Sequence, residues 1–84
     1  MHELSLALDV CRIAEDTVGR DRLPAVTEIG LEVGNRAGIE VANFTFCLEA
    51  LLGAPPFGRA RHVIELQAGD DLRVSYIEVD DGSP

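Results

Sequence analysis

The first three residues, Met1, His2 and Glu3, carry the groups of this chain best suited to hold a transition metal. A free α-amine on Met1, the imidazole of His2 and the peptide nitrogen between them can close two fused chelate rings around one ion. Nitrogen-rich square-planar or tetragonal sites favour Ni(II) or Cu(II) over magnesium or calcium. Glu3 adds a carboxylate beside these nitrogens. The alternative interpretation is that His2 is only a polar residue near a chain end, because short motifs often arise by chance.

Other patterns that indicate catalysis are missing from the sequence. It has no glycine-rich phosphate loop, no dinucleotide fingerprint, no H-E-x-x-H motif and no nucleophile elbow. His62 lies in an alternating segment and is interpreted as an ordinary strand residue. The acidic pairs Asp70–Asp71 and Asp80–Asp81 are interpreted as a solvated turn and a solvated tail. We therefore expect a protein that is not an enzyme.

Length and charge restrict the partners and the location. The 84 residues suffice for one small domain, residues 1–84. Fifteen acidic residues against seven basic ones give a net charge of -8, which repels phosphate backbones and anionic lipid. We expect neither a nucleic-acid partner nor a membrane, because no apolar run reaches the ~20 residues of a membrane span. Charged residues interrupt the first apolar segment and exclude a signal peptide, so a cytoplasmic location is expected.

The two cysteines indicate no zinc site. Cys11 and Cys47 are far apart in the sequence, and no C-x-x-C pair is present. Structural zinc sites usually need such closely spaced pairs. We therefore predict buried free thiols, with neither a disulfide nor structural zinc.

Hydrophobic patterns predict the elements that position the N-terminus. Residues 3–18 have apolar positions at helical spacing, so a helix would order His2 while leaving it exposed. Residues 27–33 alternate, with Thr27, Ile29, Leu31 and Val33 on the buried side. Residues 40–52 form a second apolar helix, and residues 61–67 and 72–79 form two strands. The short connection 68–71 between these strands predicts a β-hairpin.

The order helix, strand, helix, strand, strand predicts an α+β fold. We expect a three-stranded β-sheet with two α-helices packed on one face. A free edge strand and an almost all-round apolar first helix are compatible with a homodimer, although no residue specifies one.

Three stretches of the sequence resemble the HypA/HybF family of nickel metallochaperones. They are M-H-E-L-S-L at residues 1–6, E-V-G at 32–34, and L-R-V running into I-E-V within 72–79. The family helps to mature [NiFe] hydrogenases and, in some organisms, urease. The resemblance covers nearly the whole chain, and the M-H-E-L-S start is its most specific part. It implies Ni(II) binding through the Met1 amine, His2 and the backbone at Glu3. An acidic residue near this site is implied at Glu40. The implied partners are a nickel-handling GTPase and the hydrogenase large subunit.

The chain also departs from the family pattern. Family members normally carry a zinc-binding lobe with two C-x-x-C pairs between the last two strands. Here residues 67–71 occupy that junction, so we expect a nickel-binding domain without the zinc lobe. Glu40 stands in place of the usual Asp, and Asn35 stands where Glu is common.

Two functions remain open at this point. The first is nickel capture and hand-over. Its ligands must be deprotonated, so binding would weaken as pH falls through the α-amine and imidazole range, ~8 to ~6.5. The second is a metal-independent protein-interaction module that docks through the apolar surface of the first helix.

Overall fold

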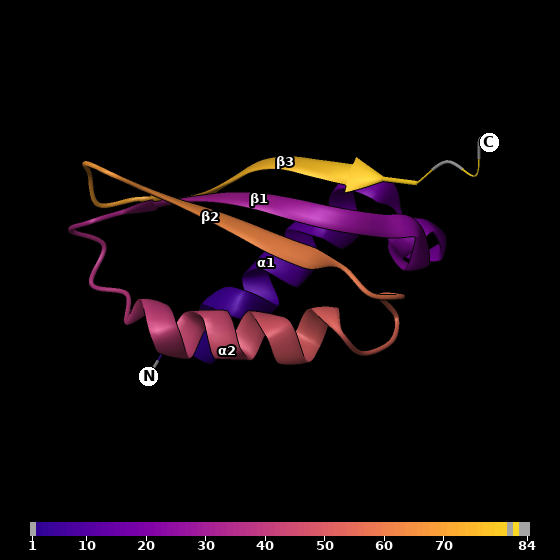
Figure 1. Ribbon diagram of the computed structural model, residues 1–84, viewed down its shortest axis with the longest axis horizontal. Helices are drawn as coiled ribbons and strands as arrows, with labels where there is room; N and C mark the ends of the chain where they lie inside the picture. Colours follow the sequence, from indigo (N-terminus) through magenta and orange to yellow (C-terminus); the bar gives the residue numbers. More distant parts are fainter. Residues whose placement is uncertain (1, 81, 83–84) are drawn as a thin grey trace.

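The molecule is a small sheet backed by two helices. A computed structural model describes residues 2–80 and 82. Along the chain it contains α1 (Glu3–Val18), the 3₁₀ helix η1 (Arg20–Ala25), β1 (Val26–Gly34), α2 (Val41–Leu52), β2 (Arg61–Gln67) and β3 (Leu72–Val79). Figure 1 shows α1 and α2 packed together beneath the sheet. The predicted α+β fold is confirmed, and η1 is an addition to the predicted elements.

Helix α1 has the bounds that its apolar spacing predicts. Ala7, Val10 and Ala14 form its fully buried stripe, while Asp9 and Arg12 make an exposed ion pair at 2.8 Å. The helix ends at Gly19, whose φ of 90° lies in the left-handed region that favours glycine. The start at Glu3 matters most for the site, because it places His2 at the N-cap position of the helix.

Strand β1 lies in the centre of the sheet. Ile29, Leu31 and Val33 are buried in the core between the sheet and the helices, as the alternation predicts. The prediction that Thr27 points into the core is wrong. Val26 is the buried residue and Thr27 is only half-buried. The pairing of β1 with β3 shifts register between Val26 and Glu28, and this irregularity inserts one residue into the alternation.

The predicted hairpin between β2 and β3 is also wrong. The strand order is β2-β1-β3, so β1 separates the two strands. Strand β2 runs parallel to β1, and β3 runs antiparallel to it. The cause is α2, because a helical crossover returns the chain to its starting side and makes the next strand parallel. The last strand pairs with the free side of β1 and not with β2.

The connection 68–71 therefore passes over the C-terminal end of β1. The N–H of Gly34 donates to the carbonyl of Asp71, and the N–H of Arg36 donates to the carbonyl of Gly69, both at 2.7 Å. A Cβ on Gly34 would overlap with the backbone oxygen of Gly69. Glycine at position 34 thus allows the two backbones to cross.

The helical layer closes the core. Phe44, Leu48 and Leu52 of α2 are fully buried against the strands. Cys11 and Cys47 are free, as predicted, but they are half-buried rather than buried. Burial raises the pKa of the Cys11 thiol. Within residues 2–80 and 82, no helix has the length and apolar character needed to cross a membrane.

Candidate metal site at the N-terminus

Helix α1 fixes the backbone at the beginning of the chain. Met1, the first of the predicted site residues, lies outside the described residues. His2 is exposed and is the N-cap residue of α1. Its carbonyl accepts the first helical hydrogen bond, from the N–H of Leu6 at 2.9 Å. The peptide group of His2 is therefore ordered by the helix while its side chain is accessible to an ion.

Glu3 is the buried carboxylate of the site, with only 7% of the residue exposed. Its Oε2 accepts a hydrogen bond from the Glu40 N–H at 3.1 Å, and its Oε1 accepts one from Asn43 Nδ2 at 3.4 Å. The Glu40 N–H is the largest cause of the lowered pKa of Glu3, and the charge of His2 acts in the same direction. Glu3 therefore stays ionised and ties the start of α1 to the start of α2.

Glu40, which the family resemblance places near the site, is the N-cap residue of α2. Its carboxylate Oε1 accepts a hydrogen bond from the Asn43 N–H at 3.0 Å, so it caps the N-terminus of α2. The structure brings Glu40 and Glu3 together through the Glu40 backbone. Sequence reasoning missed Asn43. The capping arrangement, an acceptor followed three residues later by the N–H that it binds, is the signal that could have revealed it.

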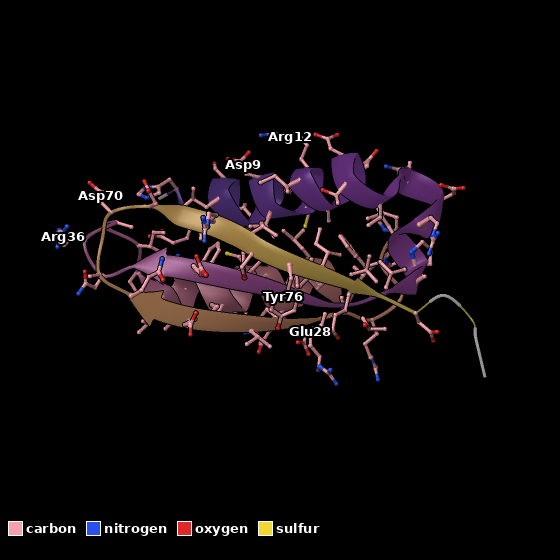
Figure 2. The ribbon with its side chains drawn as sticks, turned by 90° about the horizontal axis from the view of Figure 1, so that it is seen from above. Asp9, Arg12, Glu28, Arg36, Asp70 and Tyr76 are labelled. Atoms are coloured by element: carbon pink, nitrogen blue, oxygen red, sulfur yellow. The ribbon has the colours of Figure 1, made fainter. Side chains whose placement is uncertain are left out.

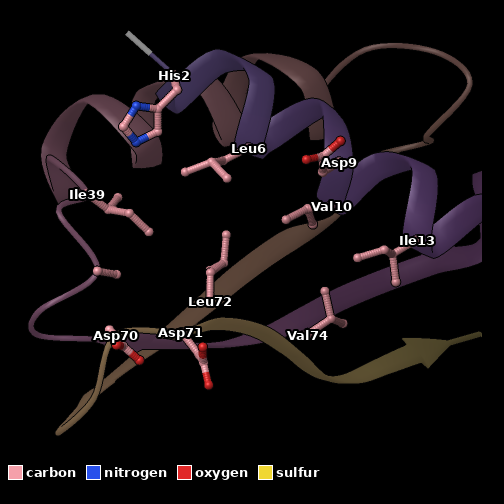
Figure 3. A pocket seen from close by; sticks show the side chains of 11 residues that line it. His2, Leu6, Asp9, Val10, Ile13, Ile39, Asp70, Asp71, Leu72 and Val74 are labelled. Atoms are coloured by element: carbon pink, nitrogen blue, oxygen red, sulfur yellow. The ribbon is translucent and has the colours of Figure 1, made fainter.

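His2 stands at the rim of a cleft of about 380 Å³ between α1 and the beginning of β3. Figure 3 shows Asp70 and Asp71 across this cleft from α1. Asp9 contributes a third carboxylate from α1, and the apolar lining includes Leu6, Val10, Ile39 and Leu72. The described lining residues include no Lys or Arg, so a cation near His2 would meet a negative field. The interpretation of Asp70–Asp71 as a solvated turn did not include their position in the cleft that His2 also lines.

Side chains of the described residues form no group of three His, Cys, Asp or Glu that could hold a metal ion. His62 lines a separate cavity with Glu49 and Arg59. A metal at the N-terminus would therefore need main-chain nitrogens in addition to the His2 imidazole. At the start of a helix, a metal can displace the proton of a peptide nitrogen without breaking a helical hydrogen bond, because the first N–H groups have no partner within the helix.

The sequence matches a family described as hydrogenase/urease nickel incorporation, metallochaperone, hypA, over residues 1–70. A hydrogenase maturation factor HypA from Polaromonas naphthalenivorans is 39% identical over 69 residues, which cover 82% of this chain and 60% of the relative. One from Cupriavidus necator is 45% identical over 51 residues, covering 61% of this chain and 43% of the relative. One from Paracoccus denitrificans is 36% identical over 67 residues, covering 79% and 59% respectively.

These matches cover the N-terminal part of the fold described above. The matched residues 1–70 include His2, Glu3, Glu40 and both helices. The chain spans 60% or less of the length of these three relatives. The family match covers most of the chain, from its first residue to the connection between the last two strands. This chain belongs to the HypA family of nickel-incorporation metallochaperones.

Proposed function

We propose that this chain captures Ni(II) at its N-terminus and hands it over during maturation of [NiFe] hydrogenase, or of urease, in the cytoplasm. The observation that carries the proposal is the exposed His2 at the first turn of a helix anchored by Glu3 to α2. Membership of a nickel-incorporation family supports the same metal. The chain acts here as a carrier, and nickel is its cargo.

The residues of the site divide into ligands and supports. The α-amine of Met1, the imidazole of His2 and the peptide nitrogens up to Glu3 would hold the ion. The Glu3 side chain positions these nitrogens, because its carboxylate is bound to Glu40 and Asn43. The carboxylates of the neighbouring cleft attract the hydrated cation. An exposed site at a chain end exchanges its metal readily, which suits delivery rather than storage.

Nickel titration of protein that begins with an unmodified Met1 tests the proposal. His2→Ala is expected to weaken Ni(II) binding by at least about tenfold, since His2 carries the only side-chain nitrogen among residues 1–3. His62→Ala is the matched control, because His62 is the other of the two histidines and lines a different cavity. Acetylation of the N-terminus is expected to abolish binding, because it removes the amine as a ligand.

Equal nickel affinity of wild type and His2→Ala would rule out this site. A lower affinity of His62→Ala than of His2→Ala would move the site to β2. Binding is also expected to weaken as pH falls from ~8 to ~6.5, where α-amines and imidazoles ordinarily take up protons. Cu(II) binds such nitrogens more tightly than Ni(II), so selectivity would depend on metal supply and partners. We expect no structural zinc.

Protein docking without metal is the second candidate function. It is favoured by Leu4 and Leu8 of α1 and by Phe46 of α2, which are between 49% and 69% exposed on the helical layer. A nickel-handling GTPase and the hydrogenase large subunit are the partners that we propose for either function. One experiment distinguishes the two functions. N-terminal acetylation abolishes nickel transfer in the first case and leaves partner binding unchanged in the second.

A further inference from the structure

Strand β2 has one side paired with β1 and one side at the margin of the sheet. Figure 2 shows β2 at the edge of the sheet that is farther from α1. The Gln67 carbonyl points toward β1, because it accepts a hydrogen bond from the Asn35 N–H at 2.8 Å. Backbone directions alternate along a strand. The N–H and C=O groups of His62, Ile64 and Leu66 therefore point outward from the sheet.

The two margins of the sheet differ in regularity. At the β3 margin, Gly30 pairs with Tyr76 and Leu31 pairs with Val74, so Ser75 is an extra residue. Such bulges disturb an edge and protect it from pairing with other strands. Strand β2 pairs with β1 without a shift from Arg61 to Gln67, and it contains neither Pro nor Gly. Its outer edge is thus a straight template for another strand.

The charges of β2 make the strand complementary to itself. In an antiparallel pair of two copies centred on Val63, Arg61 of each copy stands opposite Glu65 of the other. Both side chains are on the exposed face of the sheet, and Arg61 carries donors beyond the two that reach Glu28. Opposite charges at directly facing positions stabilise a strand pair. A pair centred on Ile64 would instead place Glu65 opposite Val63, without charge pairing.

The same register buries apolar surface and satisfies the backbone. Val63 is 45% exposed, and it would face its own copy at a non-hydrogen-bonded position, where facing side chains are closest. His62 and Ile64 of opposite copies would exchange backbone hydrogen bonds at the two flanking positions. Leu66 is 62% exposed and would be covered near the end of the ladder. The Val63 pair lies on the two-fold axis and occurs once, whereas each of the other contacts occurs twice, because the pair is symmetric.

We propose that two copies of this chain pair through β2, antiparallel about Val63, and join two three-stranded sheets into one continuous sheet. The two-fold axis of such a pair is perpendicular to the sheet, so both helical layers lie on the same side. The dimer forms without metal. Its test is therefore independent of nickel binding, and either proposal can fail alone.

Analytical ultracentrifugation of metal-free protein tests the dimer. Wild type is expected to show a concentration-dependent mass rising toward twice 9.1 kDa. Glu65→Arg places like charges opposite each other twice and is expected to raise the dimer dissociation constant about tenfold or more. Glu78→Arg makes the same charge change on β3 and is expected to have no such effect. A monomer mass for wild type up to about 1 mM, or equal weakening by both variants, would overturn the proposal.

Oxidative cross-linking tests the register. Val63→Cys is expected to give a disulfide-linked dimer, since facing Cα atoms at a non-hydrogen-bonded position lie about 4.5 Å apart, within disulfide range. Leu66→Cys is the matched control. Position 66 is more accessible than position 63, and the variant retains both native cysteines, but its two copies lie at opposite ends of the ladder. Cross-linking of Leu66→Cys as efficient as that of Val63→Cys would exclude this register.

Discussion

On the scale of single residues, Glu28 and Glu32 of β1 organise the sheet face opposite the helices. Glu28 accepts hydrogen bonds from the Tyr76 hydroxyl at 2.5 Å and from Arg61 Nη2 at 2.7 Å. Glu32 accepts one from Arg73 Nη2 at 2.6 Å. Exposed ion pairs of this kind contribute little to stability by themselves. The phenol–carboxylate contact matters more for titration, because it is the largest cause both of the raised pKa of Tyr76 and of the lowered pKa of Glu28.

The raised pKa of Tyr76 gives a direct measurement of this contact. Tyr76 is the only tyrosine in the chain, so the ultraviolet absorbance of tyrosinate reports its ionisation alone. We expect a midpoint above the ordinary value of about 10 in wild type. Glu28→Gln should return it toward that value, because a neutral amide no longer opposes the phenolate charge.

Glu32→Gln is the control for this titration. It removes the same charge from the same strand and face, next to Arg73 instead of Tyr76. We expect its midpoint to match that of wild type. The contact also stabilises the fold at neutral pH. That contribution is complete below the unfolded pKa of tyrosine and is lost as pH rises through the folded pKa. A wild-type midpoint no higher than that of Glu28→Gln would contradict this account.

On the scale of elements, the sequence predicted which segments are helices and strands, but it did not predict how the strands pair. The 3.6-residue spacing from Leu4 to Val18 and the alternation along β1 are local patterns, so the sequence alone is enough to recognise them. The position of β3 depends on the parallel crossover through α2 and on the close approach at Gly34. A four-residue connection fits a hairpin equally well by length. Only the three-dimensional order decides between them.

Gly30 and Gly34 of β1 each leave space for a different neighbour. A Cβ at position 34 would meet the backbone of Gly69 and Asp70, which cannot move aside without breaking the crossing. A Cβ at position 30 would instead overlap with the ring of Tyr76. The ring is partly exposed and can be removed by substitution without changing the strand order.

We therefore expect Gly34→Ala and Gly30→Ala each to lower the free energy of unfolding by about 1–3 kcal/mol. Tyr76→Ala should relieve most of the cost of Gly30→Ala and none of the cost of Gly34→Ala. Urea unfolding of the wild type, the three single variants and the two double variants measures both couplings. Equal relief at the two positions would contradict this assignment, because it would mean that the Tyr76 ring, and not the backbone of the connection, limits the space above Gly34.

On the scale of the whole molecule, folding assembles the site from parts that are distant in sequence. Glu3 and Glu40 are joined across 37 positions, and Glu3 and Asn43 across 40. No periodicity links such positions. His2 could be singled out from its chemistry, and Glu40 only from the resemblance to a family. The cleft residues Asp70 and Asp71 reach the neighbourhood of His2 because the β2–β3 connection crosses the end of β1.

Lowering the pH has two opposing effects on the stability of this chain, whose net charge is -8 at neutral pH. Protonation of carboxylates relieves repulsion across the molecule, which favours the folded state. Glu3 and Glu28 act in the other direction, because their folded pKa values lie below the ordinary 4.5. The unfolded chain takes up these protons first. Their contribution to stability is therefore complete above 4.5 and is lost as pH falls through the folded pKa values.

In high salt, where general repulsion is screened, the loss of these two contributions should dominate. We expect the urea midpoint of unfolding to fall steadily as the pH is lowered below 4.5. The slope should be shallower for Glu28→Gln, which has no carboxylate to protonate at that position. In low salt the relief of repulsion should offset part of the fall. A urea midpoint that rises in high salt over this range would show that neither carboxylate is stabilised in the fold. The hydrogen bonds from Tyr76 to Glu28 and from the Glu40 backbone to Glu3 would then not persist in solution.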